Sequence, residues 1–393
     1  MKSKSIGDKA ISLHKKLRVK IIVKGKISVL KNDKIQLIYT PGVAAVCKKI
    51  YRNPEQKYAL TSKWNNVAIV TDGTRILGLG NIGPDAALPV MEGKSVLYQE
   101  FGGVNAFPIC LNTTKKDEII ATIRAIEPVF GAINLEDIES PKVLEISEEL
   151  EKLIDIPVFH DDRHGTAVVV LAALLNSFRL VKKDMSSSKI VIAGAGSAGY
   201  GIAKLLTAAG CKNVVVTDSG GAIYKGRKEN MNKYKNELST TTNPKKEKGS
   251  LEDVLIGSDV FIGVSGKSNL VDSSMIKKMK SMPIVFSLTN PNPEISPDDA
   301  KKAGAKIVAT GSYLYPNKVN NALVFPHIMR AILDKRIKKI TTDILLVAAK
   351  TIASTVSVKE LGCEHILPEI DDKRIQRNLS KALSRISSKK TSR

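Results

Sequence analysis

The sequence predicts an α/β protein with two domains built around parallel sheets. Short apolar runs rich in β-branched residues alternate with longer runs of helical spacing, which is typical of alternating strands and helices. Adjacent carboxylates follow two of the short runs, at Glu136-Asp137 and Asp161-Asp162, and strand ends are where α/β proteins build their sites. A glycine loop at residues 194–199 lies between a strand pattern and a helix pattern and indicates a nucleotide-binding unit.

The first 160 residues alternate between strand and helix patterns. Residues 1–33 are rich in lysine and predict a helix at 9–17 followed by a short strand. Pro41 and Gly42 form a turn, after which a helix begins. The further helices expected here cover residues 43–50, 86–98, 117–127 and 141–153, and the expected strands cover 66–77, 106–111, 130–135 and 156–159. This alternation predicts stacked α and β layers.

The remaining residues continue the alternation with further buried strands. The expected strands cover residues 189–193, 213–218, 259–264, 284–288 and 307–309, and the expected helices cover 166–180, 197–209, 341–356 and 374–386. Residues 224–250 are polar and charged, so we expect them on the surface. The sequence has no internal repeat of the length found in solenoid proteins.

Two segments match the spacing Gly-x-Gly-x-x-Gly, at residues 78–83 and 194–199. The second follows a β-branched strand, opens a helix, and is followed by a strand that ends at Asp218, roughly 20 residues further on. This context predicts a dinucleotide site, with a pyrophosphate at the helix N-terminus and a ribose hydroxyl on Asp218. The loop comprises Gly194, Ala195, Gly196, Ser197, Ala198 and Gly199. The first match lacks a following strand that ends in an acid, so we interpret it as a tight turn near a site.

The residues after Asp218 bear on the choice between NAD and NADP. Ser219 and Gly220 supply no base for a 2′-phosphate, which favours NAD by a small margin. Lys225 and Arg227 follow closely and could bind that phosphate, so NADP stays open as the alternative cofactor.

Composition and charge limit the classes of function. The chain has 393 residues and a formal net charge of +22, but with one tryptophan and 5% aromatic residues it offers little surface for stacking bases, so nucleic acid is not expected as its primary partner. No apolar run reaches the roughly 20 residues that span a bilayer, and no signal peptide is recognisable, so no membrane role is expected. The four cysteines, Cys47, Cys110, Cys211 and Cys363, are scattered, which indicates a reducing cytoplasm.

The carboxylates at the expected strand ends have the chemistry of a divalent-metal site. Glu136, Asp137 and Asp162 offer the hard anionic oxygens that Mg²⁺ or Mn²⁺ prefers. His160 and His164 lie nearby, but without a matching cysteine or third histidine zinc is not expected. Together with the glycine loop, these residues indicate an enzyme that acts on an anionic substrate with a metal and a dinucleotide.

Several short motifs occur in one order and resemble those of the short-form malic enzymes. They lie at residues 39–44, 70–80, 91–94, 135–137, 159–162, 194–199, 289–291 and 319–321. The resemblance covers residues 35–334, and the joint order makes it specific. It implies an N-terminal α/β domain of that family, a Rossmann-type domain with a doubly wound parallel sheet, and C-terminal helices that return to the first domain.

The resemblance implies a reaction and a role for individual residues. Malate would be oxidised at C2 by hydride transfer, lose CO2 with the help of the metal, and be protonated at C3 to give pyruvate. Lys94 would be the base for the C2 hydroxyl, with a pKa lowered by burial or a nearby cation, and Tyr39 would protonate C3. Arg75 would bind a substrate carboxylate. The other implied residues are Glu136, Asp137 and Asp162 as metal ligands, Lys94, Asn290, Asn320 and Asn321 at the substrate, Asn290 at the cofactor, and Asp161 as support for Lys94 or the metal shell.

The resemblance also implies how the chain is organised. Residues 1–161 together with 320–393 would form a substrate and metal domain, and residues 162–319 would form the dinucleotide domain. The site would lie in the cleft between them, where closure excludes water. A homodimer is expected, in which Tyr39 faces a partner subunit.

Two alternative functions stay open. A malolactic-type lyase that keeps NAD bound, or an oxaloacetate decarboxylase, would use the same fold without net release of reduced cofactor. A non-catalytic basic binding protein would show salt-dependent binding of nucleic acid and no turnover. Such a binder would have no need for Tyr39, Arg75, Lys94 and the carboxylates together.

Overall fold

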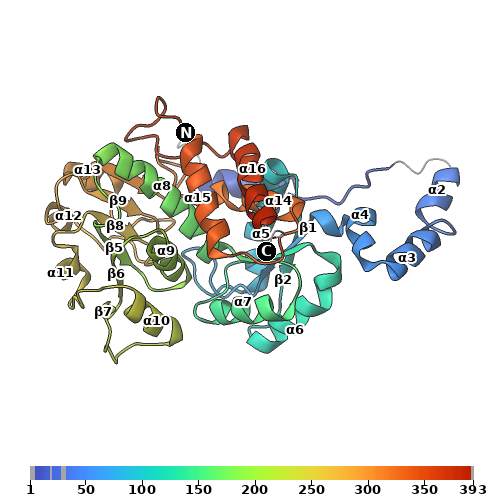
Figure 1. Cartoon of the computed structure of the whole chain (residues 1–393), viewed down its shortest axis with the longest axis horizontal. Coiled ribbons are helices and arrows are strands. Elements are labelled where there is room, and N and C mark those ends of the chain that lie inside the picture. Colours follow the sequence, from blue (N-terminus) through green and yellow to red (C-terminus); the bar gives the residue numbers. More distant parts are fainter. Residues whose placement is uncertain (1–4, 18–19, 28–31, 391–393) are drawn as a thin grey trace.

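The α/β prediction is confirmed by a computed structural model, which describes residues 5–17, 20–27 and 32–390. Its described part contains a four-stranded sheet with the order β2-β1-β3-β4 and a six-stranded sheet with the order β10-β9-β8-β5-β6-β7. Neighbouring strands are parallel except for β6 and β7. Figure 1 shows the two sheets side by side, with helices around each of them.

The first sheet separates two apolar layers. Its elements are β1 (Asn66–Thr71), α5 (Gly83–Gly102), β2 (Asn105–Cys110), α6 (Lys116–Ile126), β3 (Ala132–Leu135), α7 (Lys142–Leu153) and β4 (Val158–His160). Successive side chains of a strand point to opposite faces. Ala68 and Val70 of β1 therefore join the core with α6 and α7, whereas Val67 and Ile69 join the core on the α5 side. Both faces of β1 are covered, and every residue of the strand is buried.

The second sheet is wound in the same way. Its strands are β5 (Lys189–Ala193), β6 (Asn213–Asp218), β7 (Gly221–Ala222), β8 (Val260–Gly263), β9 (Ile284–Ser287) and β10 (Ile307–Thr310). Its helices are α9 (Ser197–Ala208), α10 (Lys233–Thr241), α11 (Leu251–Leu255), α12 (Ser273–Lys277) and α13 (Pro297–Lys302). Val191 and Phe261 pack with α11 to α13, whereas Ile190 and Ile192 pack on the side of α9. The strands expected at 189–193 and 213–218 are β5 and β6.

Four helices connect the two sheets. They are α8 (Thr166–Val181), α14 (Phe325–Asp334), α15 (Thr342–Thr355) and α16 (Lys373–Lys390). Helix α15 packs against α8 and α16, and α14 packs against α5 and α16. The amide of Asn176 on α8 donates to the carbonyl oxygens of Ala353 and Ile366, both at 2.9 Å. The C-terminal helices thus return to the first sheet, as Figure 1 shows.

Among the described residues, one helical stretch is long and apolar enough to cross a membrane. It covers Asp161–Val181, and 78% of its apolar window is buried inside the protein. Because the protein itself covers this stretch, we assign it to the core.

Three expectations about elements need correction. Residues 224–250, expected on the surface, contain α10, which Asn232 caps and whose Tyr234 and Leu238 are buried. Residues 66–77, expected to be strand-like with a tight turn at Asp72-Gly73, form a strand only as far as Thr71. The turn is present, since Gly73 has a φ of 71° and a side chain there would meet the backbone of Gly83. Residues 20–27 contain no strand, and the rest of the segment expected to hold one lies outside the described residues.

An N-terminal arm leaves the body of the protein. It contains α2 (Asn32–Ile38), α3 (Val43–Arg52) and α4 (Lys57–Leu60), while α1 (Ile6–Leu17) precedes it. Figure 1 shows α2 and α3 projecting away from both sheets. No residue of α3 is buried, and Leu37, Tyr39 and Tyr51 are 72%, 69% and 89% exposed. The arm therefore exposes several large apolar side chains.

Candidate active site

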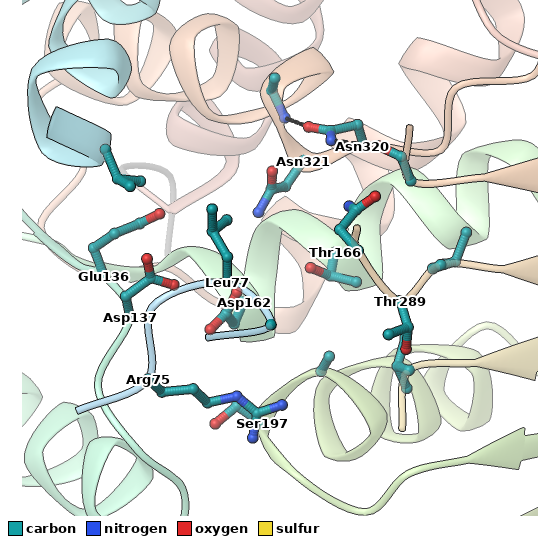
Figure 2. Close-up of a pocket in the computed structure, with 18 of the residues that line it drawn as sticks. Arg75, Leu77, Glu136, Asp137, Asp162, Thr166, Ser197, Thr289, Asn320 and Asn321 are labelled. Carbon is teal, nitrogen blue, oxygen red and sulfur yellow. Dashed lines mark hydrogen bonds between the residues drawn. The ribbon is translucent and has the colours of Figure 1, made fainter. Parts of the chain in front are cut away.

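A cavity of about 460 Å³ lies where the carboxyl ends of both sheets meet. Figure 2 shows Glu136 and Asp137 on one side of it and Thr289 with the asparagines on another. The residues expected at the site that line this cavity are Arg75, Lys94, Glu136, Asp137, Asp162, Gly196, Ser197, Ala198, Asn290, Asn320 and Asn321. The fold therefore brings together residues from both halves of the chain.

Strand register explains why the carboxylates meet. Leu135 at the end of β3 pairs with His160 at the end of β4, so the residues that follow each strand lie next to each other at one edge of the sheet. Asp137 has a φ of 49°, an uncommon conformation for a residue with a side chain, and its carbonyl oxygen accepts from Arg75 N at 3.0 Å. The local backbone is thus shaped to hold this corner of the cavity.

A single π-helical turn, Asp161–Gly165, joins β4 to α8. Wide turns of this kind occur frequently at functional sites. Here the turn keeps Asp161 fully buried, while Asp162 lines the cavity. A side chain at Gly165 would come within 2.4 Å of Asp161 Oδ1, so a larger residue here would displace the Asp161 carboxylate.

Lys94 is buried between two carboxylates. Its Nζ donates to Glu136 Oε1 at 2.7 Å and to Asp161 Oδ2 at 2.5 Å, and lies 4.0 Å from the centre of the Phe325 ring. The amide of Asn321 also donates to Asp161 Oδ2. These contacts hold the amine of Lys94 at the cavity wall, with Asp161 bonded to both Lys94 and Asn321.

The electrostatics of Lys94 differ from the expected lowered pKa. Burial alone would lower the pKa of this amine, but the charges of Asp161 and Glu136 and their hydrogen bonds raise it above its ordinary value. The amine is therefore protonated in this arrangement. A base at this position has to be the connected group of Lys94, Asp161 and Glu136 rather than a neutral amine alone.

Asp137 and Glu136 differ in how their carboxylates are compensated at the cavity. Asp137 Oδ2 is buried without a hydrogen-bond partner among the described residues. Burial and the neighbouring Asp162 raise the pKa of Asp137 to about 7. Glu136 is engaged on both oxygens, since Lys94 donates to Oε1 and Asn134 Nδ2 donates to Oε2 at 2.9 Å. The described residues contain no preformed group of three or more His, Cys, Asp or Glu side chains arranged as a metal site.

The donors present nevertheless suit a hard divalent cation. Asp137 and Asp162 line the same cavity as carboxylate oxygens, which Mg²⁺ and Mn²⁺ prefer. A cation there would also provide a partner for the orphaned Asp137 oxygen. Glu136 would have to give up its hydrogen bond with Lys94 to become a third ligand. The two aspartates are therefore the main candidates to hold the cation.

The glycine loop has the geometry of a dinucleotide site. Gly194 follows β5 with a φ of 116°, and a side chain there would come within 2.5 Å of Val264 O. A side chain at Gly199 would lie 1.8 Å from Gly194 O, so the loop and helix α9 can approach closely only with glycine at both positions. The Ser197 hydroxyl at the start of α9 is buried and unpartnered among the described residues. The loop thus places a free donor and a helix N-terminus at the cavity.

Asp218 lies at the end of β6 beside a second cavity of about 360 Å³, which Gly194, Ala195 and Gly196 also line. Its carboxylate accepts from Arg227 Nη2 and Lys235 Nζ, both at 2.7 Å. Burial alone would raise the pKa of Asp218, but these two hydrogen bonds lower it below its ordinary value. The carboxylate expected to bind the ribose is thus paired with two cations.

The asparagines expected at the substrate have different environments. Asn290 lines the cavity after β9. The side chain of Asn320 instead serves the backbone, because Nδ2 donates to Gly311 O at 2.8 Å and Oδ1 accepts from Ala322 N at 2.9 Å. Asn321 reaches the cavity while it holds Asp161. Arg75 lines both cavities, and in Figure 2 its guanidinium group lies beside Ser197 of the glycine loop.

Tyr39 does not reach the cavity within one chain. It directly follows α2 of the N-terminal arm and is 69% exposed. A catalytic role for Tyr39 in this arrangement would require a second copy of the chain.

The cavity also contains residues that the sequence did not single out as site residues. Thr166, Leu288, Tyr313 and Phe325 line it. Thr166 follows the Asp161-Asp162 pair directly, so proximity in sequence could have indicated it. Phe325 comes from α14, and nothing local in the sequence shows that this helix returns to the first sheet.

Comparisons with known proteins agree with this geometry. The family model "Malic enzyme, N-terminal domain" matches residues 17–151, and "Malic enzyme, NAD binding domain" matches residues 164–386. The chain is 48% identical to a bifunctional malic/malolactic enzyme of Bacillus subtilis over 97% of this chain and 93% of that protein. It is 46% identical to an NAD-dependent malic enzyme of Geobacillus stearothermophilus over 96% of this chain and 78% of that protein.

Solved structures give the same result for the fold. An NAD-dependent malic enzyme of Thermotoga maritima superposes with a TM-score of 0.91 at 45% identity, covering 95% of this chain and 98% of that chain. A malic enzyme of Pyrococcus horikoshii superposes with a TM-score of 0.91 at 42% identity, covering 98% and 92%. The chain carries both domains of the family in sequence and in structure, and it therefore belongs to the malic enzymes.

Proposed function

We propose that the chain catalyses the oxidative decarboxylation of L-malate to pyruvate and CO2, with reduction of a nicotinamide dinucleotide. The observation that supports this most directly is the buried group of Lys94, Asp161 and Glu136, which faces the same cavity as the glycine loop and the two aspartates. In this proposal, a proton-handling group, anionic metal ligands and a dinucleotide site surround one small substrate.

Each group has a defined task in this proposal. The C2 hydroxyl of malate would face Lys94, and its proton would enter the hydrogen-bonded group formed with Asp161 and Glu136. The amide of Asn134 donates to Glu136, and Tyr98 OH donates to Asn134 Oδ1 at 2.7 Å. These two buried residues therefore fix the position of the Glu136 carboxylate. Arg75 and Asn290 lie where they can bind substrate carboxylate or cofactor at the opposite wall.

Asp137, Asp162 and Glu136 would hold a divalent cation, Mg²⁺ or Mn²⁺. When bound, such a cation supplies a Lewis acid for decarboxylation next to C2. Asp137 and Asp162 both line the cavity, and neither forms a hydrogen bond with a cationic side chain among the described residues. Their carboxylates are therefore available to a cation, which supports their assignment as ligands.

For the cofactor, we propose NAD as the preferred dinucleotide and NADP as a weaker alternative. Asp218 would accept a hydrogen bond from the ribose diol, which a 2′-phosphate would repel. Arg227 and Lys235 lie beside that carboxylate and could partly compensate a phosphate by turning toward it. We therefore expect the chain to use both cofactors and to prefer NAD over NADP.

The assay for this function follows NADH or NADPH formation from L-malate with Mn²⁺, using NAD and NADP in separate reactions. We expect a rise in absorbance with both cofactors, faster with NAD, that disappears on chelation with EDTA. Absence of reduced cofactor in both reactions would reject the oxidative function, and a faster NADP reaction would reverse the proposed preference.

We further propose that the active form is a homodimer in which Tyr39 of one chain completes the cavity of the other. The projecting arm and the exposure of Tyr39 support this assignment. Tyr39→Phe should lower pyruvate formation by about 10²- to 10⁴-fold if the hydroxyl protonates C3. The loss should be greater for protonation than for hydride transfer, which the exchange of C3 protons in pyruvate would report.

Hybrid dimers test whether Tyr39 acts across the interface. Lys94→Ala and Tyr39→Phe proteins should each be nearly inactive, but a mixture allowed to exchange subunits should regain activity. One site of each hybrid would then combine an intact Lys94 with an intact Tyr39 from the other chain. If exchange is demonstrated and activity does not return, Tyr39 does not act in the partner's site.

The domain division and the location in the cell also stay proposals. We propose that residues 1–161 with 320–393 form the substrate and metal domain and that residues 162–319 form the dinucleotide domain. The packing of α14 against α5 supports the return of the C-terminal helices. All four cysteines are unpaired, which supports a reducing cytoplasm.

A malolactic reaction is the second candidate, because the related Bacillus subtilis protein is a bifunctional malic/malolactic enzyme. The same cavity would then keep the reduced cofactor and return its hydride to pyruvate, giving lactate. The two reactions differ in whether reduced cofactor accumulates.

A further inference from the structure

We propose that Glu294 is a positioning residue that holds the two loops after β8 and β9 in the shape required for cofactor binding. Glu294 follows the Thr289-Asn290-Pro291 motif by a few residues and is fully buried behind the cavity. It does not line the cavity itself, so it acts through the residues that it holds.

The Glu294 carboxylate accepts five hydrogen bonds from three residues. Ser265 donates to Oε1 from both N and Oγ, each at 3.0 Å. Thr289 donates to Oε2 from N at 3.2 Å and to Oε1 from Oγ1, and Ser287 Oγ donates to Oε2 at 3.2 Å. Ser265 belongs to the loop after β8, whereas Ser287 and Thr289 belong to the end of β9 and its loop. One carboxylate therefore ties two loops together.

The fold leaves space for this side chain at the end of β8. A side chain at Gly263 would lie 2.4 Å from Glu294 Cδ, so the carboxylate occupies the volume that glycine leaves free. Glu294 forms no ion pair among the described residues. Its charge is compensated by hydrogen-bond donors instead, and charge-assisted bonds of this kind are stronger than neutral ones.

The two loops that Glu294 joins form walls of both cavities. Gly266, Leu288, Thr289 and Asn290 line the larger cavity, and Ser265 lines the second cavity. A direct bond from Gly266 N to Thr289 Oγ1 at 3.0 Å connects the loops as well. Loss of the carboxylate would release four donors of Ser265 and Thr289, and the walls of the dinucleotide site would lose their common anchor.

The test compares Glu294→Gln with Asp259→Asn. Asp259 is a buried carboxylate at the opposite end of β8 that accepts from Lys189 N, Lys183 Nζ and Lys280 Nζ at 3.0 Å, and it lines neither cavity. Both variants replace a carboxylate that ties strands or loops together by its amide. NADH binding is measured by fluorescence titration of the full-length protein, with thermal unfolding recorded in parallel.

Glutamine in place of Glu294 presents an NH₂ group where the donors of Ser265 and Thr289 need an acceptor. We expect Glu294→Gln to weaken NADH binding by at least about tenfold, and Asp259→Asn to change it by less than about twofold, although both lower the unfolding temperature. Backbone amides of Ser265 and Thr289 should exchange hydrogen faster in Glu294→Gln than in Asp259→Asn. If Glu294 had only a structural role, both variants would lose stability, and they would not differ in NADH binding or in amide exchange.

Ser287→Ala provides a second variant if Glu294→Gln does not fold. It removes one donor to the carboxylate from a buried residue outside both cavities. We expect NADH binding to weaken by about threefold. NADH affinity within about twofold of the parent in Glu294→Gln, or in Ser287→Ala when that is the variant used, would overturn the proposal, and so would an equal loss in Asp259→Asn.

The inference rests on the proposed function only in that a nicotinamide dinucleotide occupies the cavity. NADH binding is measured without malate or metal, so failure of malate oxidation would leave this test intact. Conversely, if the protein oxidises malate but Glu294→Gln and Asp259→Asn do not differ in NADH binding, the proposed function stands and the proposed role of Glu294 is wrong.

Discussion

Replacement of Lys94 by alanine should reduce malate oxidation by about 10²- to 10⁴-fold, the range typical of a lost general acid or base. The variant removes the group that connects Asp161 and Glu136 at the cavity wall. It also leaves two buried carboxylates without their cation, which costs about 3–5 kcal/mol of stability. Steady-state rates and thermal unfolding should be measured together, with NADH binding as the sign that the dinucleotide site is intact.

Lys63→Ala is the matched control for Lys94→Ala. Lys63 is also buried, and its Nζ donates to Glu127 Oε1 at 2.9 Å and to Glu127 O at 2.8 Å, away from the cavity. This control should lose stability while its rate per folded molecule stays close to that of the parent. Turnover near the parent value in Lys94→Ala would show that Lys94 does not handle the substrate proton.

Neutralising Asp137 or Asp162 should weaken Mn²⁺ binding by more than about tenfold, because even indirect contacts to a metal commonly contribute that much. For Asp137→Asn we expect a gain in the stability of the metal-free protein at the same time. Burial and Asp162 raise the pKa of Asp137 to about 7, above its ordinary value, so this carboxyl increasingly opposes folding as the pH rises from about 4 to about 7. The gain from Asp137→Asn should therefore grow over that range and stay constant at higher pH.

Measuring Mn²⁺ binding together with the stability of the metal-free protein separates a metal-ligand role of these aspartates from a structural role. Asp259→Asn serves again as the control, since the pKa of Asp259 is held below its ordinary value by Lys183, Lys280 and the Lys189 amide despite burial. Its neutralisation should lower stability and leave the Mn²⁺ titration unchanged. An unaltered Mn²⁺ titration in Asp162→Asn would remove Asp162 from the proposed ligands.

Local patterns in the sequence were sufficient to predict much of the second sheet. The strands β5 and β6 and the glycine loop between them depend on neighbouring residues, because β-branched runs, glycine spacing and a following acid all lie within one unit. The meeting of Glu136, Asp137 and Asp162 could also be predicted, since parallel strands end at one edge of a sheet. Those features require no knowledge of distant packing.

Contacts between distant parts of the chain could not be predicted in the same way. The raised pKa of Lys94 follows from α5 packing beside the ends of β3 and β4, and the sequence shows only an isolated lysine in a helix. Helix α10 was missed because its apolar residues are few, yet Tyr234 and Leu238 are buried by neighbours. Nothing local in the sequence indicates that the Asn320 side chain caps the backbone of Asn321–Leu323 while the residue lines the cavity.

This malic enzyme should release pyruvate and reduced cofactor as separate products. The most direct measurement incubates the protein with L-malate, NAD and Mn²⁺ and determines NADH, pyruvate and lactate in the same reaction. We predict that NADH and pyruvate form in equal amounts and that lactate does not accumulate. Lactate formation without net NADH would contradict the claim and establish the malolactic reaction in its place.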